Sequence, residues 1–120
     1  MRGQNNRAVG TLYEDMACDY LRERGYVIVG RNYYTRHGEL DIIALDREAY
    51  AIVEVKYRKN DSYGTPFDAI TKKKSQAMRY ATSEYLYKNG LSDEVNVRFD
   101  VIGITGEGKQ LKITHLKDIM

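Results

Sequence analysis

The sequence has a single cysteine, Cys18, so an internal disulfide and a cluster of thiolate metal ligands are both excluded. No apolar run reaches the roughly 18 residues of a membrane-spanning helix. Residues 1–9 are polar and lack the apolar core of a signal peptide. We therefore expect a protein of the reducing cytoplasm that has no membrane partner.

Charge of one sign is also scarce, because the formal net charge is only +2. A small total neither establishes nor excludes nucleic-acid binding, since a local basic patch matters more. The 120 residues contain no repeat, linker or low-complexity segment, which predicts one domain over 1–120. Residues 1–8 are rich in asparagine and arginine and are expected to be flexible.

Hydrophobic periodicity predicts an α/β domain whose elements follow the order αβββαββ. The expected helices are 9–24, with Gly25 as the stop, and a second helix to Lys88 that begins at Thr65–Asp68 or at Thr71. The expected strands are 26–34, 40–45, 49–57, 95–105 and 111–116. The second and third strands should form a hairpin. The helical crossover should make the third and fourth parallel, in a central mixed sheet flanked by helices.

Two neighbouring strands carry charged residues among apolar ones. Glu54 and Lys56 are two apart and share a strand face, which alone is more often a solvated face than a site. Asp41 changes this interpretation, because it opens the strand expected to pair beside Glu54, where side chains lie about 5 Å apart. Two carboxylates so close favour a cation between them, and oxygen ligands suit Mg²⁺.

Three further charged residues bear on this site, and two of them, Glu39 and Glu14, have open alternatives. Lys56 beside such a cation can orient a water molecule and offset charge on a phosphoryl transition state. Glu39 is either a third acid or, as we expect, a solvated strand end. Glu14, at the margin of the first helix, either faces a cleft or is an ordinary exposed glutamate.

Polar residues on the second helix form a possible substrate face. Gln76 and Tyr80 are four apart and share that face with Lys73, which suits phosphate or base contacts as well as it suits a solvated surface. Basic residues, including Arg58 and the run Lys72–Lys74, flank every acidic motif, as expected for a site that a polyanion approaches.

Asp41 followed by Glu54-x-Lys56 resembles the PD-(D/E)xK nuclease signature, and the whole chain is most similar to the bacterial YraN-like family. The matching residues are Gly10, Glu14, Ala17, Tyr20, Leu21, Gly25–Tyr26, Arg31–Asn32, Gly38–Ala44, Val53–Arg58, Gly64, Pro66 and Arg98–Asp100. This resemblance implies a restriction-endonuclease-like fold related to archaeal Holliday-junction resolvases.

The resemblance also implies roles for individual residues. Asp41, Glu54 and Lys56 would be catalytic, with Glu14 as an accessory acid, and Asp41, Glu54 and the Val55 carbonyl would hold Mg²⁺ or Mn²⁺. Gln76 and Tyr80 resemble the QxxxY motif of RecB-type nucleases and, with Lys73 and Arg58, would hold the substrate.

Three functions are consistent with these observations. The first is a metal-dependent DNA endonuclease, with possible selectivity for branched DNA and a possible homodimer. The second is a nucleic-acid-binding module that keeps the fold but needs a partner or lacks activity. The third, a protein-interaction domain, is supported only by the eleven tyrosines.

Overall fold

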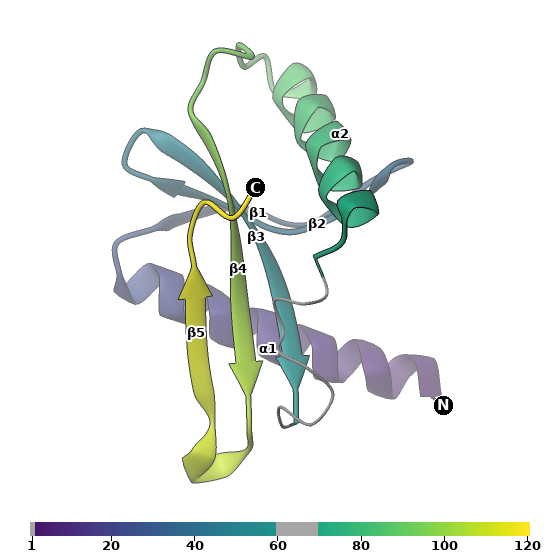
Figure 1. The fold of residues 1–120 in the computed structure, drawn as a ribbon, viewed down its shortest axis with the longest axis vertical. Helices are drawn as coiled ribbons and strands as arrows, with labels where there is room; N and C mark the ends of the chain where they lie inside the picture. The colour runs from purple at the N-terminus through teal and green to yellow at the C-terminus, as the bar shows by residue number, and fades with distance from the viewer. Residues whose placement is uncertain (1, 60–69) are drawn as a thin grey trace.

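A computed structural model describes the main chain of residues 2–59 and 70–120, and the side chains of residues 10–59 and 70–120. It is an α/β fold in which a five-stranded mixed sheet lies between two long helices (Figure 1). The elements are α1 (Arg2–Glu23), β1 (Val27–Thr35), β2 (Gly38–Asp46), β3 (Ala49–Arg58), α2 (Lys72–Lys88), β4 (Val97–Thr105), the 3₁₀ turn η2 (Gly108–Gln110) and β5 (Lys112–Leu116).

The strands lie in the sheet in chain order, β1-β2-β3-β4-β5. All neighbouring pairs are antiparallel except β3 and β4, which are parallel and are joined by the connection that contains α2. The predicted fold class, the order of elements, the hairpin and the crossover are therefore confirmed. β1 and β5 form the two edges of the sheet.

The helix ends follow local sequence signals. Gly25 follows α1 with φ +87°, a conformation that glycine adopts without the steric cost of a side chain. At α2 the hydroxyl of Thr71 accepts a hydrogen bond from the backbone N–H of Lys74, at 3.1 Å, so Thr71 is the N-cap. The alternative start at 65–68 lies outside the described residues. The main chain of α1 is already helical at Arg2, where the sequence led us to expect a flexible segment.

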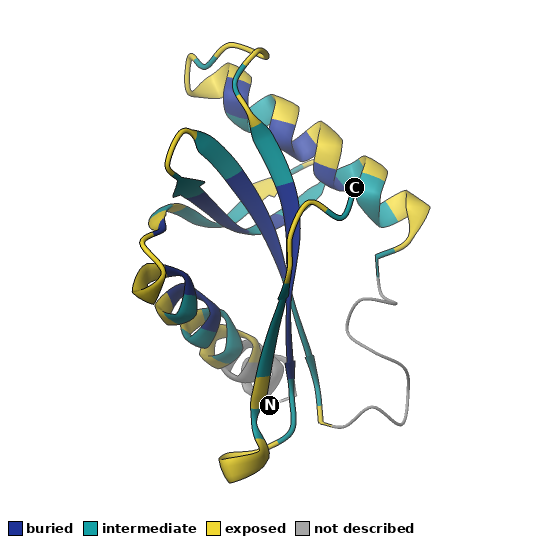
Figure 2. Cartoon of the chain, turned by 60° about the vertical axis from the view of Figure 1, so that its left-hand side comes forward, coloured by how far each residue is buried: buried dark blue, intermediate teal, exposed yellow. Residues whose placement is uncertain are grey.

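Each helix covers one face of the sheet (Figure 2). Under α1 lies a core that includes Leu21, Ile42, Val53 and Ile102. Under α2 lies a second core that includes Leu40, Ile43, Ile52, Met78 and Phe99. The alternation of strand side chains thus assigns residues 53, 55 and 57 to the α1 side and residue 52 to the α2 side. In the part of the chain that is described, no helix is long and apolar enough to cross a membrane.

Candidate active site

The candidate site lies where β2 and β3 separate. Their pairing runs from Asp46 opposite Ala49 to Ile42 opposite Val53 and ends there. Asp41 and Glu54 would form the next pair, but instead Asp41 turns its carboxylate to the other strand. Its Oδ2 accepts a hydrogen bond of 2.9 Å from the backbone N–H of Val55. The side chain thereby occupies a backbone donor that the neighbouring strand no longer reaches.

A cavity of about 390 Å³ opens at this separation, between the N-terminal part of α2 and the middle of α1. Both helices and both strands contribute to it, so it forms only when all four elements are in place. Its lining is rich in charged side chains, with four carboxylates and two lysines. The lining residues are Gly10, Tyr13, Glu14, Glu39, Asp41, Glu54, Val55, Lys56, Tyr57 and Lys74.

Glu54 is the most buried charged group of the cavity, with 3% of its side chain exposed. The Lys74 ammonium lies 2.9 Å from its Oε2, and the Lys56 ammonium lies 3.9 Å from the same atom. Burial by itself raises the pKa of Glu54, but hydrogen bonding to Asp41 and the charge of Lys74 outweigh it, so this pKa is lowered. Even so, Oε2 is buried without a well-formed hydrogen bond among the described residues.

Asp41 titrates in the opposite direction. Burial, followed by the neighbouring Glu54 carboxylate, raises the pKa of Asp41 to about 9, against a smaller opposing effect of the Val55 N–H. Opposite shifts in two adjacent carboxyl groups mean that the pair holds one proton between them. A bound cation would take the place of this proton and allow both groups to ionise.

Glu14 and Glu39 bring two more carboxylates to Asp41. One oxygen from each of these three residues lies within 4.8 Å of the others. Burial, then the charge of Glu14, raises the pKa of Glu39. Arg31 neutralises part of this charge from β1, since its Nη2 lies 3.8 Å from Glu14 and 2.7 Å from Asp15. The donors are all carboxylate oxygens, which fit a hard divalent cation such as Mg²⁺ or Mn²⁺.

Two tyrosines form one wall of the cavity. The rings of Tyr13 on α1 and Tyr57 on β3 stack with centroids 3.8 Å apart and an interplanar angle of 11°. A hydrogen bond with Tyr57, together with burial, raises the pKa of Tyr13 to about 12. Tyr13 therefore stays neutral at physiological pH, so this wall contributes hydroxyl groups but no charge.

The structure gathers all five of the predicted catalytic and metal-binding residues in this one cavity: Glu14, Asp41, Glu54, Val55 and Lys56. Glu39, which we expected to be a solvated strand end, is instead partly buried among the acids, because α1 crosses beside the start of β2. Lys74 was counted only within a basic run. A signal for its position existed, since Lys74, Met78 and Ala81 share the helix face that packs on the sheet.

The predicted substrate-binding residues lie outside this cavity. Lys73, Gln76 and Tyr80 line a shallower hollow of about 250 Å³ with His37 and Ala77. The Tyr80 ring lies 5.0 Å from the ring of His37, which comes from the β1–β2 turn. Arg58 lines neither the cavity nor the hollow, and its guanidinium donates a hydrogen bond to the carbonyl of Tyr57.

Taken together, the fold and the site define a restriction-endonuclease-like α/β domain with a cavity of carboxylates and lysines at a strand separation. The model of the uncharacterised protein family UPF0102 matches residues 13–104. The chain belongs to this family, which includes the YraN-like proteins that the sequence resembles.

Individual relatives agree with this assignment. A UPF0102 protein of Alkaliphilus oremlandii is 40% identical over 114 residues, covering 94% of this chain and 97% of the relative. One from Rhodococcus jostii is 41% identical over 115 residues, covering 95% and 97%. One from Carboxydothermus hydrogenoformans is 35% identical over 116 residues, covering 97% and 98%. The likeness thus extends over nearly the whole chain, and the family match spans the segment that holds the cavity residues from Tyr13 to Lys74.

Proposed function

We propose that this protein is a metal-dependent DNA endonuclease that hydrolyses phosphodiester bonds. The observation that carries the proposal is that the buried Glu54 lies beside Asp41, whose pKa is raised. Their carboxylates meet at a strand separation, and Oε2 of Glu54 is short of a hydrogen bond. A fold does not need such a pair for stability, because adjacent buried carboxylates repel one another. A divalent cation would relieve the repulsion that arises when both groups are ionised and would give Oε2 a further partner beside Lys74.

Asp41, Glu54 and the Val55 carbonyl would hold the cation, and Glu14 and Glu39 offer further oxygens next to Asp41. When bound, Mg²⁺ or Mn²⁺ supplies a Lewis acid for the phosphoryl oxygens and a source of activated water. Lys56, whose ammonium lies 3.9 Å from Glu54, is placed to orient the attacking water and to offset charge developing on the phosphate.

The substrate would enter over the N-terminal part of α2. Gln76, Tyr80 and Lys73 border the second hollow, and Lys73 directly precedes Lys74, which lines the acidic cavity. A nucleic acid bound along this path would meet lysines before the acids, which lowers the repulsion between its phosphates and the cavity. We also propose that the protein prefers branched DNA and forms a homodimer.

The test is a cleavage assay on labelled single-stranded, duplex, flap and four-way-junction DNA, with Mg²⁺, with Mn²⁺ or with EDTA. We expect metal-dependent cleavage that Glu54→Ala and Lys56→Ala abolish, while Lys56→Ala retains most of its DNA affinity. Lys88→Ala is the matched control, because Lys88 is an exposed lysine at the far end of α2 with only a 3.9 Å contact to Glu84. Cleavage that survives in Lys56→Ala would refute the assigned role of Lys56.

One observation favours a second function, a nucleic-acid-binding module without activity of its own. The Lys74 ammonium already lies 2.9 Å from Glu54, so the carboxylate has a counter-charge without a metal ion. Calorimetric titration with Mn²⁺ separates the two functions. The nuclease requires binding that is lost in Glu54→Gln, whereas the module requires none.

A further inference from the structure

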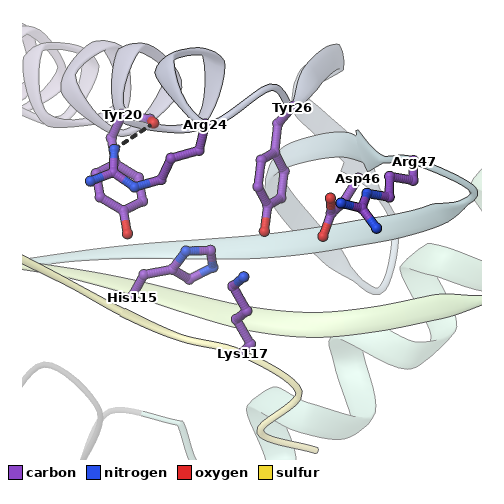
Figure 3. A pocket seen from close by; sticks show the side chains of 7 residues that line it. All are labelled: Tyr20, Arg24, Tyr26, Asp46, Arg47, His115 and Lys117. Carbon is purple, nitrogen blue, oxygen red and sulfur yellow. Dashed lines mark hydrogen bonds between the residues drawn. The ribbon is translucent and has the colours of Figure 1, made fainter.

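A second cavity, of about 450 Å³, lies apart from the candidate active site, and Figure 3 shows the side chains that line it. On β2, Asp41 borders one cavity and Asp46 the other, five residues or about 17 Å further along the strand. The two cavities share no lining residue. Tyr20, Arg24, Tyr26, Asp46, Arg47, His115 and Lys117 line this second cavity.

The floor of this cavity is a buried polar network built on Asp100, whose side chain is fully buried. Asp100 accepts hydrogen bonds from Arg98 at 2.9 and 3.0 Å and from the backbone N–H of Asp118 at 3.0 Å. Arg98 also donates to Asp46 at 2.9 Å and to the Tyr26 hydroxyl at 2.8 Å. Asp46, the one carboxylate among the lining residues, is therefore already paired with Arg98.

The rim, by contrast, carries three cations. Arg24 is held in place, because its guanidinium stacks 3.6 Å from the centroid of the Tyr20 ring and donates to the Tyr20 carbonyl. Within the described ranges, no carboxylate oxygen lies within 4.0 Å of a side-chain nitrogen of Arg47 or Lys117. Arg24, which also lies 3.9 Å from Glu23 outside the lining, borders with Arg47 and Lys117 a space whose one acid is paired with Arg98, which favours an anion there.

His115 adds a fixed polar group to the wall. Only 4% of its side chain is exposed, and its Nε2 lies 2.8 Å from Oδ2 of Asp100. This contact orients the ring, and its Nδ1 has no hydrogen-bond partner in the described part of the chain. Figure 3 shows the His115 ring and the Lys117 ammonium directed into the same space as the Tyr26 hydroxyl. Because Asp100 engages Nε2, Nδ1 is left for a hydrogen bond with a ligand in the cavity.

We propose that this cavity is a second binding site, which takes the phosphate group of a nucleotide. A guanidinium binds two phosphate oxygens at once, and the anionic oxygens of a phosphate group suit the cations of this lining. The volume lies within the range of small-molecule sites and exceeds what a bare phosphate needs, and the two tyrosines offer ring faces and edges to a nucleoside. The phosphate belongs either to a free mononucleotide or to a nucleic-acid chain. The proposal does not depend on the nuclease function.

The test is titration of the ¹³C,¹⁵N-labelled protein with adenosine 5′-monophosphate, followed by NMR at the ring signals of His115 and Tyr26. We expect saturable shifts at these rings, with an affinity at least about tenfold weaker in Arg47→Ala/Lys117→Ala, since each phosphate contact is charge-assisted. Lys88→Ala/Lys109→Ala removes the same charge from exposed positions elsewhere and should bind as the native protein does. Glu54→Ala should also bind normally, which separates this proposal from the nuclease.

Competition then identifies the source of the phosphate. Displacement of the nucleotide by unphosphorylated duplex DNA supports a site for the nucleic-acid backbone, and displacement only by a 5′-phosphorylated oligonucleotide supports a site for a terminal monoester. The proposal is overturned if the native protein shows no saturable shift at His115, or if Arg47→Ala/Lys117→Ala binds as tightly as the native protein. Lys117→Ala alone, at an exposed position, provides the same comparison if the double variant does not fold.

Discussion

Replacing Asp41 with asparagine should stabilise the metal-free protein at neutral and alkaline pH. The pKa of Asp41 is about 9 in the folded protein, whereas an aspartate in an unfolded chain has a pKa of about 3.9. Between these values the folded state holds a proton that the unfolded state has released. The free energy of unfolding therefore falls as the pH rises, by up to about 1.4 kcal/mol per pH unit.

The magnitude follows from this slope and from the position of the side chain. Between pH 5 and pH 8 the slope amounts to at most about 4 kcal/mol. Asp41 is only partly buried and borders an open cavity, so screening by water should reduce the effect to about 2 kcal/mol. Asparagine keeps an oxygen that can accept from Val55, but it has no proton to take up. At pH 8 the free energy of unfolding of the variant should therefore be about 2 kcal/mol higher than that of the native protein.

The assay is urea denaturation from pH 5 to pH 8 in EDTA, repeated with Mg²⁺. Without metal, the native protein should lose stability as the pH rises and Asp41→Asn should not. With metal, only the native protein should gain stability, because a cation replaces the proton between the carboxylates. Asp93→Asn, at an exposed position, is the matched control. If the native protein and Asp41→Asn show the same pH slope in EDTA, the inference that burial and Glu54 hold a proton on Asp41 is wrong.

Three further predictions concern charged groups. Lys74→Ala should lower the free energy of unfolding by about 2 kcal/mol at pH 7, because buried Glu54 loses its closest counter-charge while Lys74 itself is about one-third exposed. Burial raises the pKa of Asp100, but bonds from His115 and Arg98 lower it by more. Its stabilisation should be complete above about pH 4 and lost as the pH falls further, and Asp100→Asn should lack this acid transition. Glu39→Gln should weaken Mn²⁺ binding by about tenfold, as measured by calorimetry, if Glu39 shares the cation with Asp41.

Each of these predictions has a control. Lys72→Ala removes the neighbouring exposed lysine of α2, and a loss of stability equal to that of Lys74→Ala would show that the ion pair is irrelevant. For Asp100→Asn, an acid transition identical to that of the native protein would contradict the assigned pKa shift. The control for Glu39→Gln is Glu84→Gln, which changes a glutamate on the outer part of α2 and should leave the Mn²⁺ affinity unchanged. If the affinity is also unchanged in Glu39→Gln, Glu39 is not part of the metal site.

Much of the candidate site was predictable because strand periodicity is a local property. Glu54 and Lys56 had to share a face, and the short hairpin had to bring Asp41 beside Glu54, whatever the rest of the fold. The N-cap at Thr71 and the stop at Asn89 and Gly90 also follow from local hydrogen-bonding preferences. These inferences needed no knowledge of distances between elements that are remote in the chain.

The burial of Glu39, the ion pair of Lys74 and the second cavity were not predictable in this way. Each depends on how closely a helix approaches the sheet, which results from the packing of both cores together. The Arg98–Asp46 bond joins residues 52 positions apart, and the Arg98–Tyr26 bond joins residues 72 apart. No local pattern marks such a pair, since an arginine on a strand looks the same whether it is solvated or bonded.

Local sequence patterns are enough to predict the order of the elements and the face on which each strand residue lies. They also predict that Asp41, Glu54 and Lys56 meet at the hairpin. They do so because backbone geometry repeats every two residues in a strand and every 3.6 in a helix. The burial of these charges, the opposite pKa shifts of Asp41 and Glu54 and the gathering of cations around the second cavity depend instead on the packing of the whole fold. Burial and charge interaction depend on distances through space, and these arise when α1 and α2 close over the two faces of the sheet.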